Sequence, residues 1–355
     1  MINILKIFIP AILSFLIGIA ITPVCTHFFY KYKLWKGSSR LDNPDEMSPA
    51  FKELHNTSMA AETKTPRVGG IIIWGSVLIT ILLVYVLKNV FGGPVLGKLD
   101  FLSYNQTLLP LLALVFGGIF GLFEDFVEIF ADKFAVIKQG LPSRYLIAIV
   151  ACIGLAASLW FYIKLGLRDI YVPFFGYWHV GFWFIPIFII VTLGTFSSRV
   201  IDGIDGLAGG VMAVAYGAFG TIALIQNQID IATFCFVVAG GILAFLWFNI
   251  PPARFYMGET GMLGLTLALA FIVFLVDGVF LLPIIGALLL ATSFSSTAQI
   301  ISKKIRGPVK GKIFKVAPLH LHFQALGWSR EKITMRYWIL SLMFAVAGIL
   351  LAIIG

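Results

Sequence analysis

Few acidic, amide or imidazole side chains interrupt the apolar stretches of this sequence, and several of them gather in short motifs at the ends of those stretches. The motifs are Glu124-Asp125, Asp202-Gly-Ile-Asp205, Asn249, Glu259 and His320-Leu-His322. Burying an unpaired carboxylate in lipid is costly, so ionisable residues in or beside apolar spans usually mark a functional site. We therefore expect these motifs to converge on one site.

Glu124 and Asp125 stand at the end of the apolar run from Leu111 to Phe123. Neighbouring carboxylates repel one another, and a cation between them relieves that repulsion. Mg²⁺ is suited to such a pair because it binds few carboxylates and keeps positions for water or phosphate oxygens. The pair indicates a magnesium site, with solvation of a helix end as the alternative.

Two further motifs have side chains that could contact a ligand. Asp202 and Asp205 precede the next apolar stretch, where they could accept hydrogen bonds from sugar hydroxyls or base N–H groups or cap the following helix. Tyr256 and Glu259 lie in a short connection after Asn249. The tyrosine could stack on a nucleobase or belong to the aromatic belt of the membrane interface.

The loop before the last apolar stretch combines cations with two histidines. Six Lys and Arg residues lie between 303 and 315, ahead of His320 and His322. The cations could attract anionic headgroups or recruit phosphate. An extended backbone would place both imidazoles on one side, whereas a helix would set them about 200° apart. Zinc is weakly supported because no third histidine is nearby, and phosphate or sugar contacts suit the charge better.

The apolar stretches predict an all-α polytopic membrane protein. Apolar residues make up 59% of the chain and charged residues 12%, and the mean hydropathy is +0.97. We count about ten stretches near the length of roughly 20 residues that a span needs. They start near Ile4, Val68, Gln106, Arg144, Trp178, Leu207, Ile229, Gly261, Gly278 and Thr334. We expect a single integral membrane domain over residues 1–355, with a short external β-hairpin within 169–179.

The Lys and Arg residues are divided unevenly between alternate loops. Of the 26, all but five lie in loops 31–67, 124–144, 199–206, 250–260 and 303–336, and the last four of these loops carry the acidic and histidine motifs; the exceptions are Lys6, Lys88, Lys98, Lys164 and Arg168. By the positive-inside rule, the motif-bearing loops are cytoplasmic and both termini are periplasmic or extracellular. The net charge of +9 then reflects topology, and no nucleic-acid partner is expected. His27, His179 and Asp277 stand apart from the motifs, and we expect no direct chemistry of them.

Together these segments resemble the phospho-N-acetylmuramoyl-pentapeptide transferases, within the superfamily of polyprenyl-phosphate N-acetylhexosamine-1-phosphate transferases. The resemblance covers nearly the whole chain. It rests on the order and spacing of Thr65-Pro66-x-x-Gly69-Gly70, Glu124-Asp125, Asp202-Gly-x-Asp205-Gly-Leu-Ala, Phe248-Asn249 and Met257-Gly-Glu259-x-Gly261. The most specific segment is Phe314-Lys-Val-Ala-Pro-Leu-His-Leu-His-Phe323, followed by Gly327-Trp328. It looks like the muramoyl branch of the superfamily.

The resemblance implies Mg²⁺-dependent transfer of phospho-MurNAc-pentapeptide from UDP-MurNAc-pentapeptide to undecaprenyl phosphate, which releases UMP and forms lipid I for peptidoglycan synthesis. It also implies a multi-pass protein of the bacterial inner membrane whose active site faces the cytoplasm, and it is compatible with a homodimer.

By the same resemblance, three acids carry the chemistry. Glu124 falls where an aspartate is proposed to activate the lipid phosphate, with Asp125 beside it. Glu259 falls where an aspartate binds the metal, so Asp125 and Glu259 are the expected Mg²⁺ ligands. Positions near the nucleotide and the sugar are matched by Lys64, Asp202, Asp205, Asn249, Tyr256, Gln299, His320 and His322.

The chain departs from the family pattern at six positions. Glu124 and Glu259 replace Asp, Arg199 replaces Asn, Glu128 replaces Lys, Arg67 replaces Thr, and Leu321 interrupts a run of three histidines. Arg67 makes its motif look more like the relatives that transfer GlcNAc, so UDP-GlcNAc is the alternative donor. A transporter would place its acids near mid-span, whereas these lie at span ends. A noncatalytic scaffold is the third alternative.

Overall fold

The computed structural model describes residues 2–35, 64–91, 99–102, 106–130, 141–307 and 310–355. Most of the loop between the first two apolar stretches lies outside these residues. The long helices are α1 (Ile2–Lys31), α3 (Gly70–Phe91), α5 (Leu108–Ile129), α6 (Ser143–Lys164), α7 (Phe184–Ser197), α8 (Leu207–Ile225), α9 (Ile229–Asn249), α10 (Gly258–Leu275), α12 (Ala287–Arg306) and α14 (Arg330–Ile354). The shorter ones are η3 (Gly181–Trp183), η4 (Ser198–Ile201), α11 (Leu282–Ile285) and α13 (Leu319–Ala325).

The described residues contain 9 helical segments long and apolar enough to cross a membrane, which confirms a polytopic helical protein. The stretch expected from Gly278 differs from the others. It breaks at Gly286 into α11 and α12, and α12 is not among the candidate spans. The reason is compositional, because Thr, Ser and Gln residues occupy its buried side and its last turn is basic.

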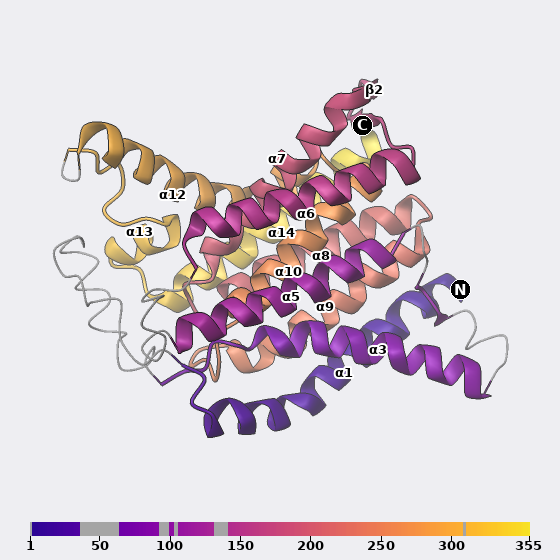
Figure 1. Cartoon of the computed structure of the whole chain (residues 1–355), viewed down its shortest axis with the longest axis horizontal. Coiled ribbons are helices and arrows are strands. Elements are labelled where there is room, and N and C mark those ends of the chain that lie inside the picture. Colours follow the sequence, from indigo (N-terminus) through magenta and orange to yellow (C-terminus); the bar gives the residue numbers. More distant parts are fainter. Residues whose placement is uncertain (1, 36–63, 92–98, 103–105, 131–140, 308–309) are drawn as a thin grey trace.

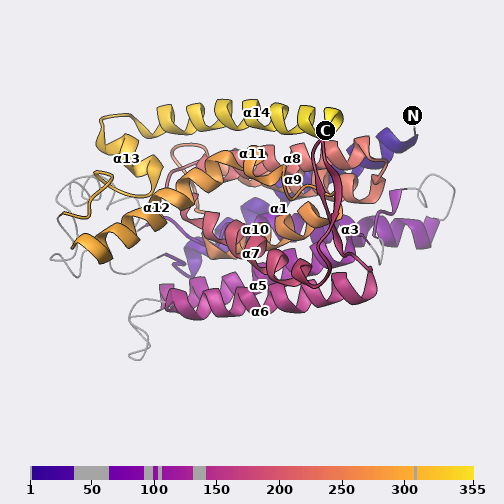
Figure 2. The ribbon, with the colours of Figure 1, turned by 90° about the horizontal axis from the view of Figure 1, so that it is seen from above.

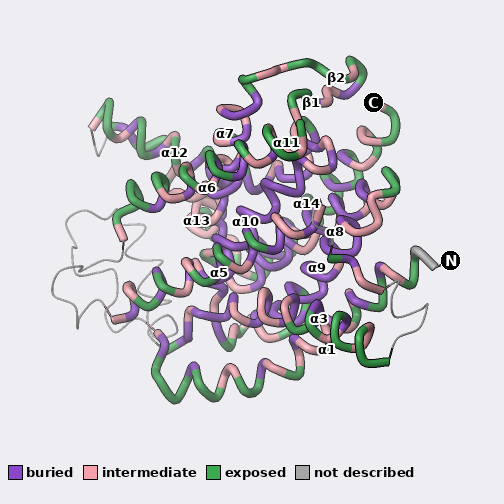
Figure 3. The backbone as a smooth tube through the Cα atoms, turned by 45° about the vertical axis from the view of Figure 1, so that its right-hand side comes forward, coloured by how far each residue is buried: buried purple, intermediate pink, exposed green. Residues whose placement is uncertain are grey.

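Helix α10 forms the centre of the bundle, and nearly all of its residues are buried. It packs mainly against α5, while α9 packs against α1 and α8. Figure 2 shows α14 along one edge of the bundle and α6 along the opposite edge, and Figure 3 shows burial concentrated between them. A Cβ at Gly117 would lie 2.8 Å from the Cα of Gly264. Small residues therefore let α5 and α10 approach closely.

The β-hairpin expected within 169–179 is confirmed. Strands β1 (Asp169–Val172) and β2 (Gly176–His179) pair antiparallel, with Asp169 opposite His179. In Figure 1 the hairpin and both termini lie toward one end of the bundle, whereas α12 and α13 extend from the other end. The acidic motifs lie at the end of α5 and the starts of α8 and α10. These helix ends are at the end of the bundle opposite the hairpin.

Candidate active site

The glycine-rich segment before α3 and the connection before α10 run side by side. The backbone N–H of Tyr256 donates to the carbonyl of Pro66 at 2.7 Å, and Gly69 N–H donates back to the carbonyl of Tyr256 at 2.9 Å. Gly70 N–H continues the ladder to the carbonyl of Met257 at 3.0 Å. A Cβ at Gly70 would collide with the backbone of Gly261. The glycines are needed because the two backbones are in contact.

Asp125 joins the end of α5 to the start of α10. Its carboxylate accepts hydrogen bonds from the backbone N–H groups of Glu259 (3.2 Å) and Thr260 (2.8 Å) and from the hydroxyl of Thr260 (2.6 Å). The first N–H groups of a helix lack intrahelical acceptors, so a carboxylate there is favourable. Gly258 has φ +68°, and an added Cβ would lie 2.5 Å from an oxygen of Asp125. This junction therefore requires glycine.

Glu124, Asp125 and Glu128 each contribute one oxygen to a group in which all oxygens lie within 4.8 Å of one another. Glu124 is 7% exposed, and its Oε2 has no hydrogen-bond partner among the described residues. The donor set is all carboxylate oxygen, which fits a hard divalent cation such as Mg²⁺. An orphaned buried oxygen facing two further carboxylates is the feature that such a cation would satisfy.

Two arginines are paired with acids of this site. Arg67 Nη1 lies 3.6 Å from Glu128 Oε2. Arg199 lies in η4, directly after α7, and forms an ion pair with Glu259. Its guanidinium also lies over the ring of Phe196, 4.7 Å from the ring centroid. The charges of both arginines act on Glu124. Four of the departures from the family pattern are thus paired with one another.

Asp202, Asp205 and Asn249 hold the connection between α9 and α10 against the start of α8. Asp202 accepts the backbone N–H of Gly258 (3.0 Å), and Asp205 accepts that of Ala253 (3.1 Å). The amide of Asn249 accepts the N–H of Gly206 at 2.9 Å and donates to the carbonyl of Phe255 at 2.8 Å. Burial raises the pKa of Asp202 to about 6. These three side chains therefore hold the backbone of the candidate site in place through hydrogen bonds.

The histidines lie on a helix, not on an extended segment. His320 is 1% exposed, its Nδ1 has no hydrogen-bond partner among the described residues, and burial lowers its pKa to about 4. A Cβ at Gly203 would lie 2.7 Å from its Nε2, so the ring borders the Asp202 motif. His322 points elsewhere, and its Nδ1 accepts the N–H of Lys315 at 3.2 Å.

The other sequence-predicted residues are placed as follows. The amide of Gln299 accepts the N–H groups of Ile313 and Phe314 and donates to the carbonyl of Phe314, so it shapes the basic loop. Tyr256 lies between the glycine-rich segment and α10, and Lys64 is exposed two residues before Pro66. Gln299 thus contacts the basic loop, while the backbone of Tyr256 contacts the glycine-rich segment.

Sequence reasoning identified the acids but not their partners. Thr260, which donates to Asp125, was not among the candidates, and the pairings of Arg67 with Glu128 and of Arg199 with Glu259 were not foreseen. A signal was present for the pairs. Two of the departures from the family pattern are arginines and two others are their glutamate partners, so complementary charges appear among the departures although they lie in different motifs.

The sequence of the chain is similar to known proteins along nearly its whole length. A model described as glycosyl transferase family 4 matches residues 107–277. The chain is 31% identical over 348 residues to a phospho-N-acetylmuramoyl-pentapeptide-transferase of Bacillus cytotoxicus and 32% identical over 349 residues to those of Bacillus mycoides and Bacillus thuringiensis. Each alignment covers 97% of this chain and 97% of the relative.

Proposed function

Because the chain belongs to the phospho-N-acetylmuramoyl-pentapeptide-transferase family, we propose that it transfers phospho-MurNAc-pentapeptide from UDP-MurNAc-pentapeptide to undecaprenyl phosphate. An oxygen of the lipid phosphate forms a bond to the sugar-linked phosphorus, the bond from that phosphorus to the bridging oxygen breaks, and UMP leaves with that oxygen. The product is lipid I. The observation that carries the proposal is the meeting of the α5 acids with the start of α10, in a chain similar to these enzymes along its length.

The carboxylates of Glu124, Asp125 and Glu128 lie close enough together to fit Mg²⁺. Asp125 belongs to this group and is also a ligand expected from the family resemblance, which adds Glu259 as the second. When bound, Mg²⁺ would offset the negative charge of the diphosphate and of the leaving UMP. Asp125 is fixed by three donors and would supply a remaining lone pair. Glu259 forms an ion pair with Arg199. Its carboxylate would therefore have to bind Mg²⁺ either while keeping this ion pair or after releasing it.

The chain itself would contribute positioning and charge, which dominate phosphoryl transfer. A phosphate monoester has a second pKa of about 6 and is largely ionised near neutral pH. Glu124 then needs only to orient the attacking phosphate, not to remove a proton. Arg67 and Arg199 place two guanidinium groups beside the acids, where they suit phosphate oxygens. Tyr256 would stack on the uracil, with Lys64, Asp202 and Asp205 toward the nucleotide.

In this proposal the site faces the cytoplasm of a bacterial cell and the protein spans the inner membrane. The test is a donor-choice assay with purified protein, undecaprenyl phosphate and Mg²⁺. We expect UMP release and lipid I with UDP-MurNAc-pentapeptide, and loss of both in Glu124→Ala, Asp125→Ala and Glu259→Ala. Near-normal turnover by all three variants would refute the site.

UDP-GlcNAc is the second candidate donor, and Arg67 is the observation in its favour. The arginine stands in the glycine-rich segment beside Tyr256 and pairs with Glu128, so the donor meets a different surface from the one a threonine would offer. Faster UMP release with UDP-GlcNAc than with UDP-MurNAc-pentapeptide would favour this donor. No UMP release with either donor would favour a noncatalytic scaffold.

A further inference from the structure

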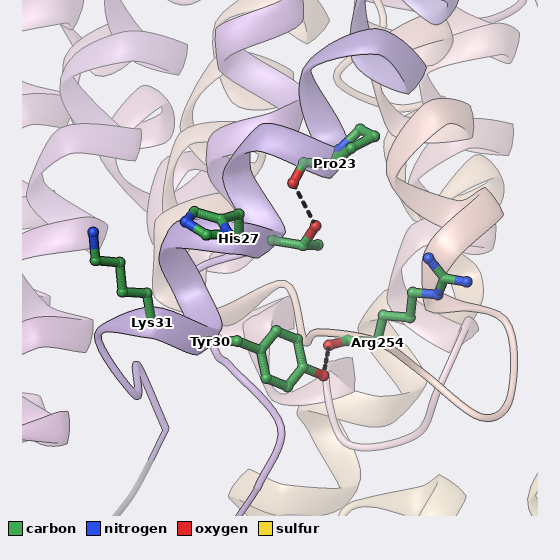
Figure 4. A pocket seen from close by; sticks show the side chains of 6 residues that line it. Pro23, His27, Tyr30, Lys31 and Arg254 are labelled. Atoms are coloured by element: carbon green, nitrogen blue, oxygen red, sulfur yellow. Dashed lines mark hydrogen bonds between the residues drawn. The ribbon is translucent and has the colours of Figure 1, made fainter.

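A cavity lies apart from the acidic motifs, between the last turns of α1 and the connection from α9 to α10. Its volume is about 580 Å³, and it is lined by Pro23, Thr26, His27, Tyr30, Lys31 and Arg254. Figure 4 shows that α1 supplies one wall and that Arg254 lies across from it. The proposed reaction assigns no role to any of these residues.

The walls of this cavity are tied together. The hydroxyl of Tyr30 donates to the backbone carbonyl of Arg254 at 2.9 Å, and Arg254 N–H donates to the carbonyl of Phe248 at 3.0 Å. On α1 the hydroxyl of Thr26 donates to the carbonyl of Pro23 at 2.9 Å. The cavity is therefore formed before any ligand arrives, which lowers the entropic cost of binding.

The free donors in the cavity all suit an anion. The hydroxyls of Thr26 and Tyr30 already donate to backbone carbonyls, which leaves the imidazole of His27, the ammonium of Lys31 and the guanidinium of Arg254. Among the described residues no carboxylate lines the cavity, and neither Lys31 nor Arg254 forms an ion pair with another described residue. A guanidinium fork binds phosphate oxygens in pairs, and an ammonium adds a point charge.

The surroundings favour a lipid as the source of the phosphate. The cavity lies at the end of a membrane span whose neighbouring side chains are apolar and exposed: Val24 is 59% exposed, Phe28 46% and Tyr32 59%. The rings of Phe28 and Tyr32 stack with centroids 6.2 Å apart. Acyl chains can lie along this face while the headgroup enters the cavity. We propose that the cavity binds the phosphate of an anionic glycerophospholipid.

A lipid bound there would act on the connection that leads to the active site. Arg254 follows Ala253, which is held by Asp205, and precedes Phe255, which is held by Asn249. The occupant would bridge α1 to this connection and complete the restraint on the backbone before Glu259. Binding itself does not require the chain to be a transferase.

The test measures lipid retention, not turnover. Full-length protein in detergent is titrated with dioleoyl-phosphatidylglycerol or dioleoyl-phosphatidylcholine, and bound lipids are counted by native mass spectrometry. We expect one phosphatidylglycerol to be retained in preference to phosphatidylcholine, and the Lys31→Gln/Arg254→Gln double variant to bind it about ten-fold more weakly, the effect of losing about 1.4 kcal/mol. Arg144→Gln is the matched control, because it removes an exposed cation at the start of α6 and should leave binding unchanged.

Equal phosphatidylglycerol binding by the parent, the double variant and the control would overturn the proposal. Glycerol 1-phosphate supplies the soluble-phosphate arm, and binding of it without binding of the lipid would overturn the lipid assignment. Both substituted side chains are exposed, so the double variant should melt with the parent in the absence of lipid. Arg254→Lys, which keeps the charge and loses the fork, should bind with intermediate affinity.

Discussion

The carboxylates of the site form two groups that differ in what holds them. Asp125, Asp202 and Asp205 accept backbone N–H groups from the connection before α10 or from its first turn. The glutamates are held differently: within the described residues Glu124 has an orphaned oxygen, and Glu128 and Glu259 face arginines. The short side chains are fixed to the backbone, and the longer ones reach the space between the helices.

This difference separates groups that build the site from groups that can exchange partners. A carboxylate fixed by several N–H donors is costly to displace because each donor would be left unpaired. A carboxylate paired with an arginine side chain can pass to a ligand when the arginine passes to the opposite charge. The glutamates can therefore pass to a cation and their arginines to a phosphate, while the aspartates stay fixed to the backbone and Asp125 keeps a lone pair for the cation.

The largest effect on turnover is expected at Glu124, whose Oε2 has no hydrogen-bond partner among the described residues. Glu124→Gln should lower turnover about a hundred-fold or more, because it removes the charge that orients the reacting phosphate. Its melting temperature should stay equal or rise, since a buried unsatisfied charge is removed. Glu331→Gln, an exposed carboxylate at the start of α14, serves as the control. Loss of stability in Glu124→Gln would place Glu124 in the fixed group.

Asp125→Asn should reduce both activity and stability. An amide keeps one acceptor but turns an N–H₂ group toward donors of α10, so about 3 kcal/mol of stability is at stake. A thermal melt of the detergent-solubilised protein should show a clear fall relative to Glu124→Gln. If both variants melted alike, the division between fixed and exchangeable carboxylates would be wrong.

Arg199→Asn should free Glu259 and strengthen Mg²⁺ binding. Glu259, which we propose as a Mg²⁺ ligand, is ion-paired with Arg199. Removing this cation removes both competition and repulsion, and we expect about ten-fold tighter binding, equivalent to about 1.4 kcal/mol. The measurement is the rise in melting temperature with added Mg²⁺ in the absence of substrate. Arg144→Asn is the charge-matched control, and an unchanged Mg²⁺ response in Arg199→Asn would show that the arginine does not compete.

The helical membrane fold and the acidic motifs could be predicted from the sequence, because the length of an apolar stretch and the type of a residue are local properties. The hairpin within 169–179 was also predicted from its β-forming residues. The role of Asp202 as a support for Gly258 was not, since the N–H that faces a carboxylate is decided by packing of distant segments. The sequence left open whether the segment with His320 and His322 is extended or helical. In the structure both residues lie in α13.

The smallest net effect in the parent protein is expected from a pair of opposing pH dependences at the border of the site, because the two contributions nearly cancel. Burial raises the pKa of Asp202 to about 6, above its ordinary value of about 3.9, so this group adds stability as the pH falls from about 6 to about 4. Burial lowers the pKa of His320 to about 4, so this group loses stability as the pH falls from about 6.5 to about 4. Each contribution is about 3 kcal/mol, and in the parent they oppose one another.

Single substitutions should separate the two contributions. Asp202→Asn leaves His320 and should make acidification more destabilising than in the parent, whereas His320→Gln leaves Asp202 and should make it less so. The measurement is the melting temperature of each variant relative to the parent between pH 4 and pH 6.5. Parallel curves for both variants would mean that neither group is desolvated as its position beside Gly203 and Gly258 implies, and that solvent reaches the border between the fixed carboxylates and the histidine helix.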